Sequence, residues 1–265
     1  MPIQIPIYQV DAFTDRVFAG NPAAICPLEE WLPDEVMQSI AAENNLSETA
    51  FFVRRPDGEY DLRWFTPTIE FDMCGHATLA SGHVLLTKLT PDEELVAFHT
   101  RSGRLTVLRD GDRLEMDFPA QDAPLNIDPV LLAAVASALG KTPNALRVTH
   151  TIMAVFDHHS QVASLKPDFA AINQLDIPYI IATAPGDETD FVSRFFAPGG
   201  GIDEDPVTGS SHTIMTPYWV SRLSKNPLTA RQLSKRGGNL WCRLAGDRVI
   251  ISGYARDYMQ GQIEI

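Results

Sequence analysis

The sequence predicts an α+β fold of two similar halves, each a mixed β-sheet curved around a central helix. Three observations support this prediction. Motifs of the first half recur in the second, strands and helices do not follow a strict β–α–β alternation, and each half contains one helix of small residues. Strict alternation would instead favour a Rossmann-type parallel sheet. The length of 265 residues suffices for two modest domains with cores of their own.

The internal repeat carries most of this argument. Residues 63–67 (RWFTP) recur as residues 194–198 (RFFAP), and each copy precedes an acidic loop and the start of a small-residue helix. Residues 102–114 likewise resemble residues 237–249. Because order and spacing are nearly the same, we expect a duplication, with the extra residues of the second copy in the glycine loop at 199–201.

The elements of the first half follow from hydrophobic periodicity. Residues 32–44 place Val36, Ile40 and Ala41 on one face, as in an amphipathic helix, and the DGD sequence at 110–112 indicates a hairpin turn. Residues 76–89, rich in Ala, Ser and Gly, predict a buried central helix. Strands are expected at residues 3–13, 48–53, 60–65, 95–99, 104–108 and 113–118.

The second half repeats this mixture. A small-residue helix is expected from Gly209, kinked rather than ended by Pro217. Further helices are expected at residues 129–139 and 167–175, and strands at residues 152–156, 179–184, 191–196, 240–244, 248–252 and 262–265. The PAQDAP stretch at 119–124 is the expected seam. We therefore expect a first domain at 1–118, completed by the C-terminal strand near 256–265, and a second domain at 119–265.

Charge and cysteine content narrow the class of protein. A net charge of −13 argues against nucleic acid and against an anionic membrane surface as partners. Three scattered cysteines do not form a disulfide framework, and the N-terminus has no basic region of a signal peptide. We expect a soluble cytoplasmic protein.

Both small-residue helices begin at glycine-containing loops. Free N–H groups and the positive dipole end at two such N-termini bind a small anion, most simply a carboxylate, if both face one cleft between the halves. Ser210, Ser211 and Thr78 are candidate hydroxyl donors. The alternative is that both loops merely cap their helices.

Acid–base candidates flank these loops. Glu48 lies where a helix leads into a strand and is either an acid–base group or a helix cap. His76 lies in the first turn of the central helix, where the helix dipole predicts a lowered pKa and a neutral ring. Asp205 is either a cap or a second acid. Asp72, Cys74 and His76 have a metal-ligand spacing but no second cluster, so we predict no metal, and no nucleotide-binding or hydrolase motif is present.

Four motifs together resemble the signatures of the PhzF-like family, named for a phenazine-biosynthesis isomerase, over essentially the whole chain. They are GNPA at 20–23, NLSET at 45–49, CGHATL at 74–79 and DEDPVTGS at 203–210. The resemblance implies the fold of diaminopimelate epimerase and a cofactor-free isomerase acting on a small carboxylate-bearing metabolite, with a homodimer as the expected assembly. It implies Glu48, His76 and Asp205 as catalytic residues. It implies a substrate-binding set of Gly20, Asn21, Gly75, Ala77, Gly209, Ser210 and Ser211.

The chain departs from relatives of this fold in one informative way. Epimerases and racemases of the fold use two opposed cysteines, whereas here Cys74 occupies the first position and Thr208 the second. Two alternatives to the isomerase therefore stay open: an epimerase or racemase that uses Cys74, and a non-catalytic small-molecule binder on the same scaffold.

Overall fold

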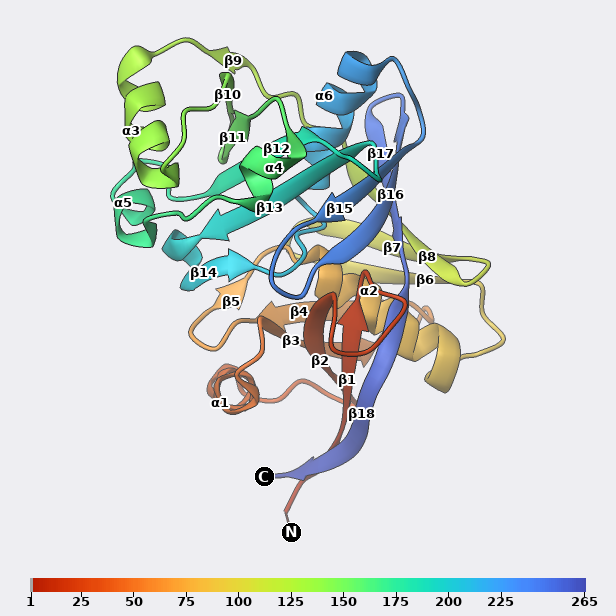
Figure 1. The fold of residues 1–265 in the computed structure, drawn as a ribbon. Coiled ribbons are helices and arrows are strands. Elements are labelled where there is room, and N and C mark those ends of the chain that lie inside the picture. Colours follow the sequence, from red (N-terminus) through yellow and green to blue (C-terminus); the bar gives the residue numbers. More distant parts are fainter. Residues whose placement is uncertain (1) are drawn as a thin grey trace. The chain divides into compact units, whose positions relative to one another are not determined.

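A computed structural model describes residues 2–265, which form two compact units. The first unit runs up to Phe118 and takes in Ile250–Ile265, and the second spans Pro119–Val249. Each is a mixed β-sheet with helices, so the predicted α+β class is confirmed (Figure 1). Within residues 2–265, no helix is long and apolar enough to span a membrane.

The first unit is built on a sheet that surrounds one helix. Its strands are β1 (Gln4–Ala12), β2 (Asn21–Leu28), β3 (Glu48–Arg54), β4 (Tyr60–Phe65), β5 (Glu70–Phe71), β6 (Leu95–Thr100), β7 (Gly103–Asp110), β8 (Arg113–Pro119) and β18 (Ala255–Glu264). Its helices are α1 (Asp34–Asn44) and α2 (Gly75–Val84), and α2 continues into the π-helical turn η1 (Leu85–Leu89). The small-residue helix α2 contacts β1, β2, β3, β7 and β18, so its predicted central place is confirmed.

The second unit has the same plan with more helices. Its strands are β9 (Leu125–Asn126), β10 (Ala145–Val148), β11 (Ile152–Val155), β12 (Ile180–Pro185), β13 (Phe191–Ala197), β14 (Ile202–Asp205), β15 (Leu228–Gln232) and β16 (Gly238–Ala245). Its helices are α3 (Pro129–Leu139), α4 (His159–Ala163), α5 (Phe169–Asn173), the 3₁₀ turn η2 (Pro198–Gly200) and α6 (His212–Leu223). β17 (Arg248–Gly253) leads from this unit into the first.

The repeat seen in the sequence is a repeat of strand pairing. In the first unit β2 is parallel to β3, β3 is antiparallel to β4, and β4 pairs antiparallel with β5 and parallel with β6. In the second unit β11, β12, β13, β14 and β15 pair in the same order and with the same directions. The duplication inferred from the motifs is therefore present in the fold.

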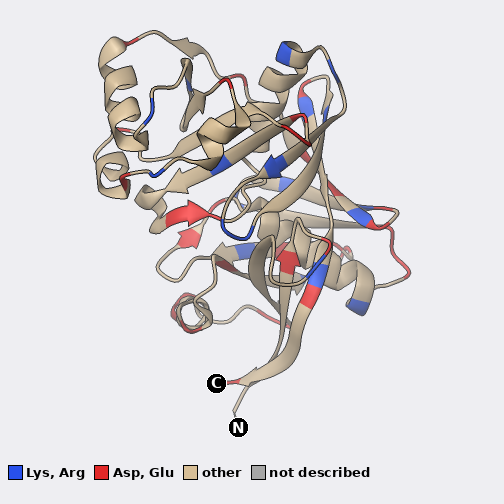
Figure 2. Cartoon of the chain, in the orientation of Figure 1, with Lys and Arg blue, Asp and Glu red and all other residues tan. Residues whose placement is uncertain are grey.

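The repeated motif has the same local structure in both copies. The Arg63 guanidinium donates to both oxygens of Glu70, at 2.7 and 2.8 Å, and Arg194 binds Glu204 at the same two distances. In each copy the carboxylate comes from a short acidic strand, β5 or β14 (Figure 2). Each arginine also lies over a phenylalanine of its own strand, at 5.2 Å from the Phe65 centroid in β4 in the first copy. Bidentate pairs of this kind fix the register of the two strands that they join.

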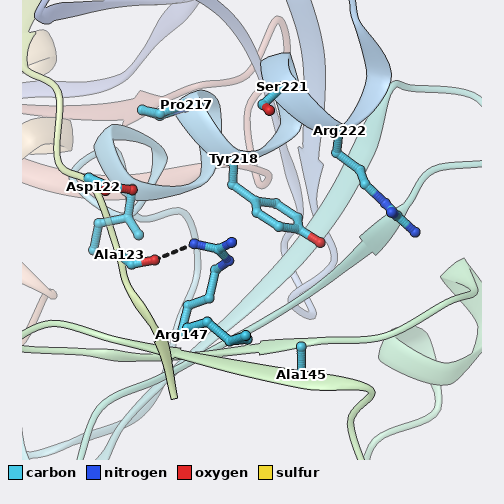
Figure 3. A pocket seen from close by; sticks show the side chains of 10 residues that line it. Asp122, Ala123, Ala145, Arg147, Pro217, Tyr218, Ser221 and Arg222 are labelled. Atoms are coloured by element: carbon cyan, nitrogen blue, oxygen red, sulfur yellow. Dashed lines mark hydrogen bonds between the residues drawn. The ribbon is translucent and has the colours of Figure 1, made fainter. Parts of the chain in front are cut away.

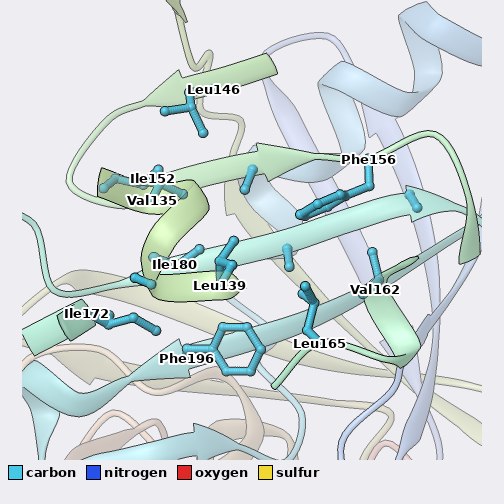
Figure 4. Packing of buried hydrophobic residues seen from close by; sticks show 14 of the residues in the cluster. Val135, Leu139, Leu146, Ile152, Phe156, Val162, Leu165, Ile172, Ile180 and Phe196 are labelled. Carbon is cyan, nitrogen blue, oxygen red and sulfur yellow. The ribbon is translucent and has the colours of Figure 1, made fainter. Parts of the chain in front are cut away.

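Each unit has its own hydrophobic core. In the first, Met37 and Ile40 of α1 pack on buried residues of the sheet. In the second, Val135 and Leu139 of α3 pack against Ile152, Ile180 and Phe196 (Figure 4).

The C-terminal strand belongs to the sheet of the first unit. β18 pairs antiparallel with β1 from Gln4 opposite Glu264 to Ala12 opposite Ala255, which makes it longer than the strand expected at 262–265. The two chain ends therefore lie side by side (Figure 1). In the second unit the two-residue strand β9 occupies the corresponding place beside β10.

The structure tests two predictions about helix α6, the effect of Pro217 and the first residue of the helix. Pro217 lies inside α6, which continues to Leu223, so the prediction that it does not end the helix is confirmed. The helix begins at His212 rather than Gly209, because residues 209–211 form the turn before it.

We predict that Gly20 is required by the turn before β2. Its φ of +65° is strained for other residues, and an added Cβ would lie 2.1 Å from the Ala12 carbonyl oxygen. Gly111 has a similar φ of +60° with nothing near an added Cβ. Gly111→Ala should lower the free energy of unfolding by about 1–2 kcal/mol, and Gly20→Ala by about 3 kcal/mol or more. Urea unfolding measures both, and equal losses would contradict the steric argument.

Candidate active site

The N-terminal end of α2 in the first unit brings together residues from three motifs of the sequence. The turn at Gly20 leads into β2, whose first residue, Asn21, is fully buried. Glu48 is the first residue of β3, directly opposite Ala23 of the parallel strand β2, and is 9% exposed. His76 lies in the first turn of α2 and is buried.

These side chains form a connected polar group. His76 Nε2 lies 3.0 Å from Glu48 Oε2, and His76 Nδ1 lies 3.1 Å from the Asn21 amide nitrogen and 3.4 Å from Cys74 Sγ. Nδ1 of the ring therefore faces Asn21 and Cys74, while Nε2 faces Glu48, so each ring nitrogen has a polar neighbour. Asn21 and Glu48, which are distant from His76 in the sequence, therefore both contact its ring in the folded protein.

The alternative role of Glu48 as a helix cap is wrong. Helix α1 ends at Asn44 and is capped by Asn45 in the left-handed conformation, whose N–H donates to Ala41. Glu48 belongs to the following strand, and its carboxylate contacts His76 instead.

The pKa of His76 departs from its ordinary value in the direction opposite to the prediction. Burial alone would lower it, but the neighbouring Cys74 and Glu48 groups and the hydrogen bonds to both raise the pKa of His76 well above its usual range. The helix dipole was expected to lower it, and these neighbours outweigh that effect because they lie much closer to the ring. The prediction of a lowered pKa was therefore wrong.

The pKa of the Cys74 thiol is raised, which disfavours the reactive thiolate. Burial, followed by the charge of Glu48, raises the pKa of Cys74 to about 11. Cys74 precedes α2, where helix N-termini commonly favour thiolates, but here the neighbouring carboxylate opposes the charge. At neutral pH Cys74 is a thiol.

The remaining predicted residues of the first unit lie in the same place. Gly75 and Ala77 form the first turn of α2, which has no side-chain cap, and both are buried. The first N–H groups of a helix have no partner within the helix, so this turn is a place where an anion can bind.

In the second unit the predicted residues form a braced loop before α6. Asp205 accepts a hydrogen bond from the Thr208 hydroxyl, and it is not the cap of α6, whose N-cap is Ser211. Gly209, Ser210 and Ser211 form the turn that leads into the helix.

Two of the three predicted hydroxyl donors are already used. Thr78 Oγ1 donates to the Cys74 carbonyl at 2.6 Å, and Ser211 Oγ donates to the Thr208 carbonyl at 2.8 Å. Both hydroxyl protons are therefore engaged in the turns themselves, so neither hydroxyl donates to an anion in this arrangement.

Gln232 was missed in the sequence. It lies fully buried on β15, where its side-chain oxygen accepts from the Thr208 N–H at 2.9 Å and its amide donates to the Asp205 carbonyl at 2.8 Å. The signal was present, since Leu228, Ala230 and Gln232 alternate onto the buried face of one strand. A glutamine on such a face must find partners, and here it holds the loop.

Glu48, Cys74 and His76 also have the chemistry of metal ligands. One ligand atom of each lies within 4.8 Å of the others. However, Cys74 lies beside Nδ1 and Glu48 beside Nε2, so the ring does not offer the same nitrogen to an ion bound by both neighbours. Asp72, the third residue of the spacing noted in the sequence, is exposed and faces Arg101 instead.

Comparison with known proteins assigns the chain to a family. The model of the phenazine biosynthesis-like proteins, PhzC-PhzF, matches residues 10–261. An uncharacterized isomerase of Pseudomonas aeruginosa is 49% identical over 263 residues, which cover 99% of this chain and 100% of the relative. The chain belongs to the PhzF-like family.

The structural comparisons agree with this assignment. A crystal structure of a PhzF-family phenazine biosynthesis protein from Enterococcus faecalis has a TM-score of 0.94 at 44% identity, covering 99% of this chain and 100% of that chain. A hydroxyproline epimerase from Agrobacterium vitis, with a TM-score of 0.61 at 12% identity over 99% and 93% of the two chains, shares the fold. The epimerase-like fold and membership in a family of isomerases, both expected from the motifs, are confirmed.

We predict that Glu48 sets the protonation of His76 in this PhzF-like protein. Glu48→Gln should lower the pKa of His76 by about one unit or more, because a close negative charge is removed. NMR titration of the imidazole measures this, and Glu43→Gln on the exposed face of α1 is the matched control. An unchanged pKa of His76 in Glu48→Gln would contradict the assigned pairing.

The same shift predicts how stability varies with pH. Folding raises the pKa of His76, so protonation of this residue stabilises the folded state. This stabilisation is fully present below the pKa of the unfolded chain, about 6.5, and is lost as the pH rises through the raised pKa of the folded protein.

We predict that the native protein resists thiol alkylation. All three cysteines are buried, and the pKa of Cys26 and of Cys242 is raised by burial to about 12. With a pKa of about 11, Cys74 is thiolate in roughly one molecule in a thousand at pH 8. Iodoacetamide followed by peptide mass spectrometry should label all three only after unfolding. Rapid labelling of Cys74 alone would show an activated thiol.

Proposed function

We propose that this protein is a cofactor-independent isomerase that moves a proton on a small carboxylate-bearing metabolite, with Glu48 as the acid–base group. The observation that carries the proposal is the buried contact between Glu48 and His76 at the first turn of α2. A carboxylate that is fixed in one position and largely removed from water is suited to take a proton from carbon and return it.

Each neighbour of Glu48 has a defined part in the proposal. Asn21 and Glu48 hold the His76 ring from its two sides, with Nδ1 facing the Asn21 amide and Nε2 facing the carboxylate. Glu48 then accepts a proton from one carbon of the substrate and, as the acid, returns it to another carbon. The proton count is unchanged after one turnover, and Glu48 is again ionised.

The carboxylate of the substrate is proposed to bind at the first turn of α2. Gly75 and Ala77 lie there, at the positive end of the helix dipole. We further propose, on the family resemblance, that Asp205 and the turn of Gly209, Ser210 and Ser211 contribute to binding the same substrate. The kinetics of Ser210→Ala test the role of this turn separately. If the turn binds the substrate, this substitution should raise KM more than it lowers kcat.

We predict that turnover depends on the carboxylate of Glu48. The protein is incubated with a metabolite extract in D₂O, and deuterium uptake is followed by mass spectrometry. The wild type should introduce deuterium into a carboxylate-bearing metabolite, and Glu48→Gln should reduce this by about a hundred-fold or more, the usual contribution of a general acid–base. Glu43→Gln is the control that changes the same group on an exposed part of α1.

The other outcomes favour other functions. Undiminished deuterium uptake by Glu48→Gln would exclude Glu48 as the acid–base group. A metabolite that binds wild type and Glu48→Gln equally, with no deuterium uptake by either, would favour the non-catalytic binder.

One observation favours the epimerase alternative. Cys74 Sγ lies 3.4 Å from His76 Nδ1, which is the distance expected of a thiol that exchanges a proton with imidazole. Two features weigh against it: the raised pKa of Cys74, and the presence of Thr208, whose hydroxyl already donates to Asp205, at the second cysteine position. Rapid alkylation of Cys74 in the native protein would reverse this ranking.

A further inference from the structure

The second unit contains a cavity that the proposed function does not use. It has a volume of about 380 Å³ and lies among the chain segment before β9, the strand β10 and the helix α6 (Figure 3). This is within the size range of small-molecule sites in proteins. None of the predicted active-site residues lines it.

A guanidinium group dominates the cavity. Arg147 reaches from β10 and donates to the carbonyl of Ala123, and its guanidinium carbon lies 5.1 Å from the centre of the Tyr218 ring (Figure 3). Stacking on an aromatic ring and a backbone hydrogen bond hold the group in place but leave most of its five N–H donors unused.

Arg147 differs in this respect from the arginines of the repeated motif. Arg63 and Arg194 are each bound by a carboxylate, whereas within residues 2–265 no carboxylate forms an ion pair with Arg147. A half-buried guanidinium without a counter-ion is well suited to bind a carboxylate from outside, since it forms two parallel hydrogen bonds with that group.

The other lining residues define the ligand further. Arg222 lies at the rim and is likewise without an ion pair among the described residues, while Asp122 contributes one negative charge, so the lining carries a net positive charge. Leu125, 58% exposed, and the buried Ile214 provide apolar wall. A local positive site in a protein of net charge −13 attracts anions selectively.

We propose that this cavity binds a small organic carboxylate with a flat apolar body. The carboxylate pairs with Arg147, Arg222 adds long-range attraction, and the body packs on the apolar wall beside Tyr218. The site is separate from the residues assigned to proton transfer, so it can bind a ligand whether or not the proposed function holds.

The test uses benzoate as the probe and benzamide as its uncharged counterpart. Titration of the ¹⁵N-labelled protein should give saturable shifts of the amide signals of Ala145, Tyr218 and Ser221 with benzoate, and affinity for benzamide should be lower by about ten-fold. Arg147→Gln should weaken the affinity for benzoate by about ten-fold, and Arg222→Gln should weaken it by about two-fold. Asp122→Asn should strengthen benzoate binding by about two-fold, because a repelling charge is removed.

The controls make each outcome decisive. Arg243→Gln removes an exposed arginine of β16 outside the cavity and should leave the affinity unchanged. If thermal melting shows that Arg147→Gln is unfolded, the other two variants still test the proposal. Arg222→Gln should weaken benzoate binding, and Asp122→Asn should strengthen it. The proposal is overturned if the cavity amides do not shift, if benzamide binds as well as benzoate, or if only the amides around Gly75 and His76 respond.

Discussion

The first unit depends on one steric constraint: a sheet must close around α2 on almost every side. Several positions of a helix in that place have room only for small side chains, and Ala77, Ala80, Ser81 and Gly82 meet this requirement. The limit is visible at Gly82, where an added Cβ would lie 2.5 Å from a methyl carbon of Val107 on β7. Strands cover its sides, and Glu48, Cys74 and His76 meet at its N-terminal end.

That constraint explains why the reactive groups are gathered where they are. Asn21 begins β2, Glu48 begins β3, and both strands contact α2. Their first residues therefore lie next to His76, and burial makes each of the contacts among them stronger than it would be in water. The second unit has the same pairing order, yet the corresponding loop is braced by Gln232 rather than by a charged pair. Duplication preserved the fold while the side chains at the two helix ends diverged.

Local patterns sufficed for the elements but not for their interactions. Periodicity gave the bounds of β4 and α3 as they are found, because both segments have clear apolar faces. β2 was not expected as a strand, since Asn21 and Pro22 are poor strand formers at its start. The pKa direction of His76 was mispredicted because Glu48, one of the two groups that raise it, comes from a distant part of the chain, and because the contact of Cys74 with the ring depends on the turn before α2. The motifs identified Glu48, Asn21 and His76, whereas their contacts required the fold.

The pairing of β1 with β18 has a consequence for synthesis on the ribosome. β1 emerges early, but the strand that covers its edge is the last of the described strands to be made. Until then the first unit has an open edge of backbone N–H and C=O groups, while the second unit already has β9 to pair with β10. The first unit therefore closes this edge only after residues 255–264 have been made, whereas β9 and β10 of the second unit are close in sequence.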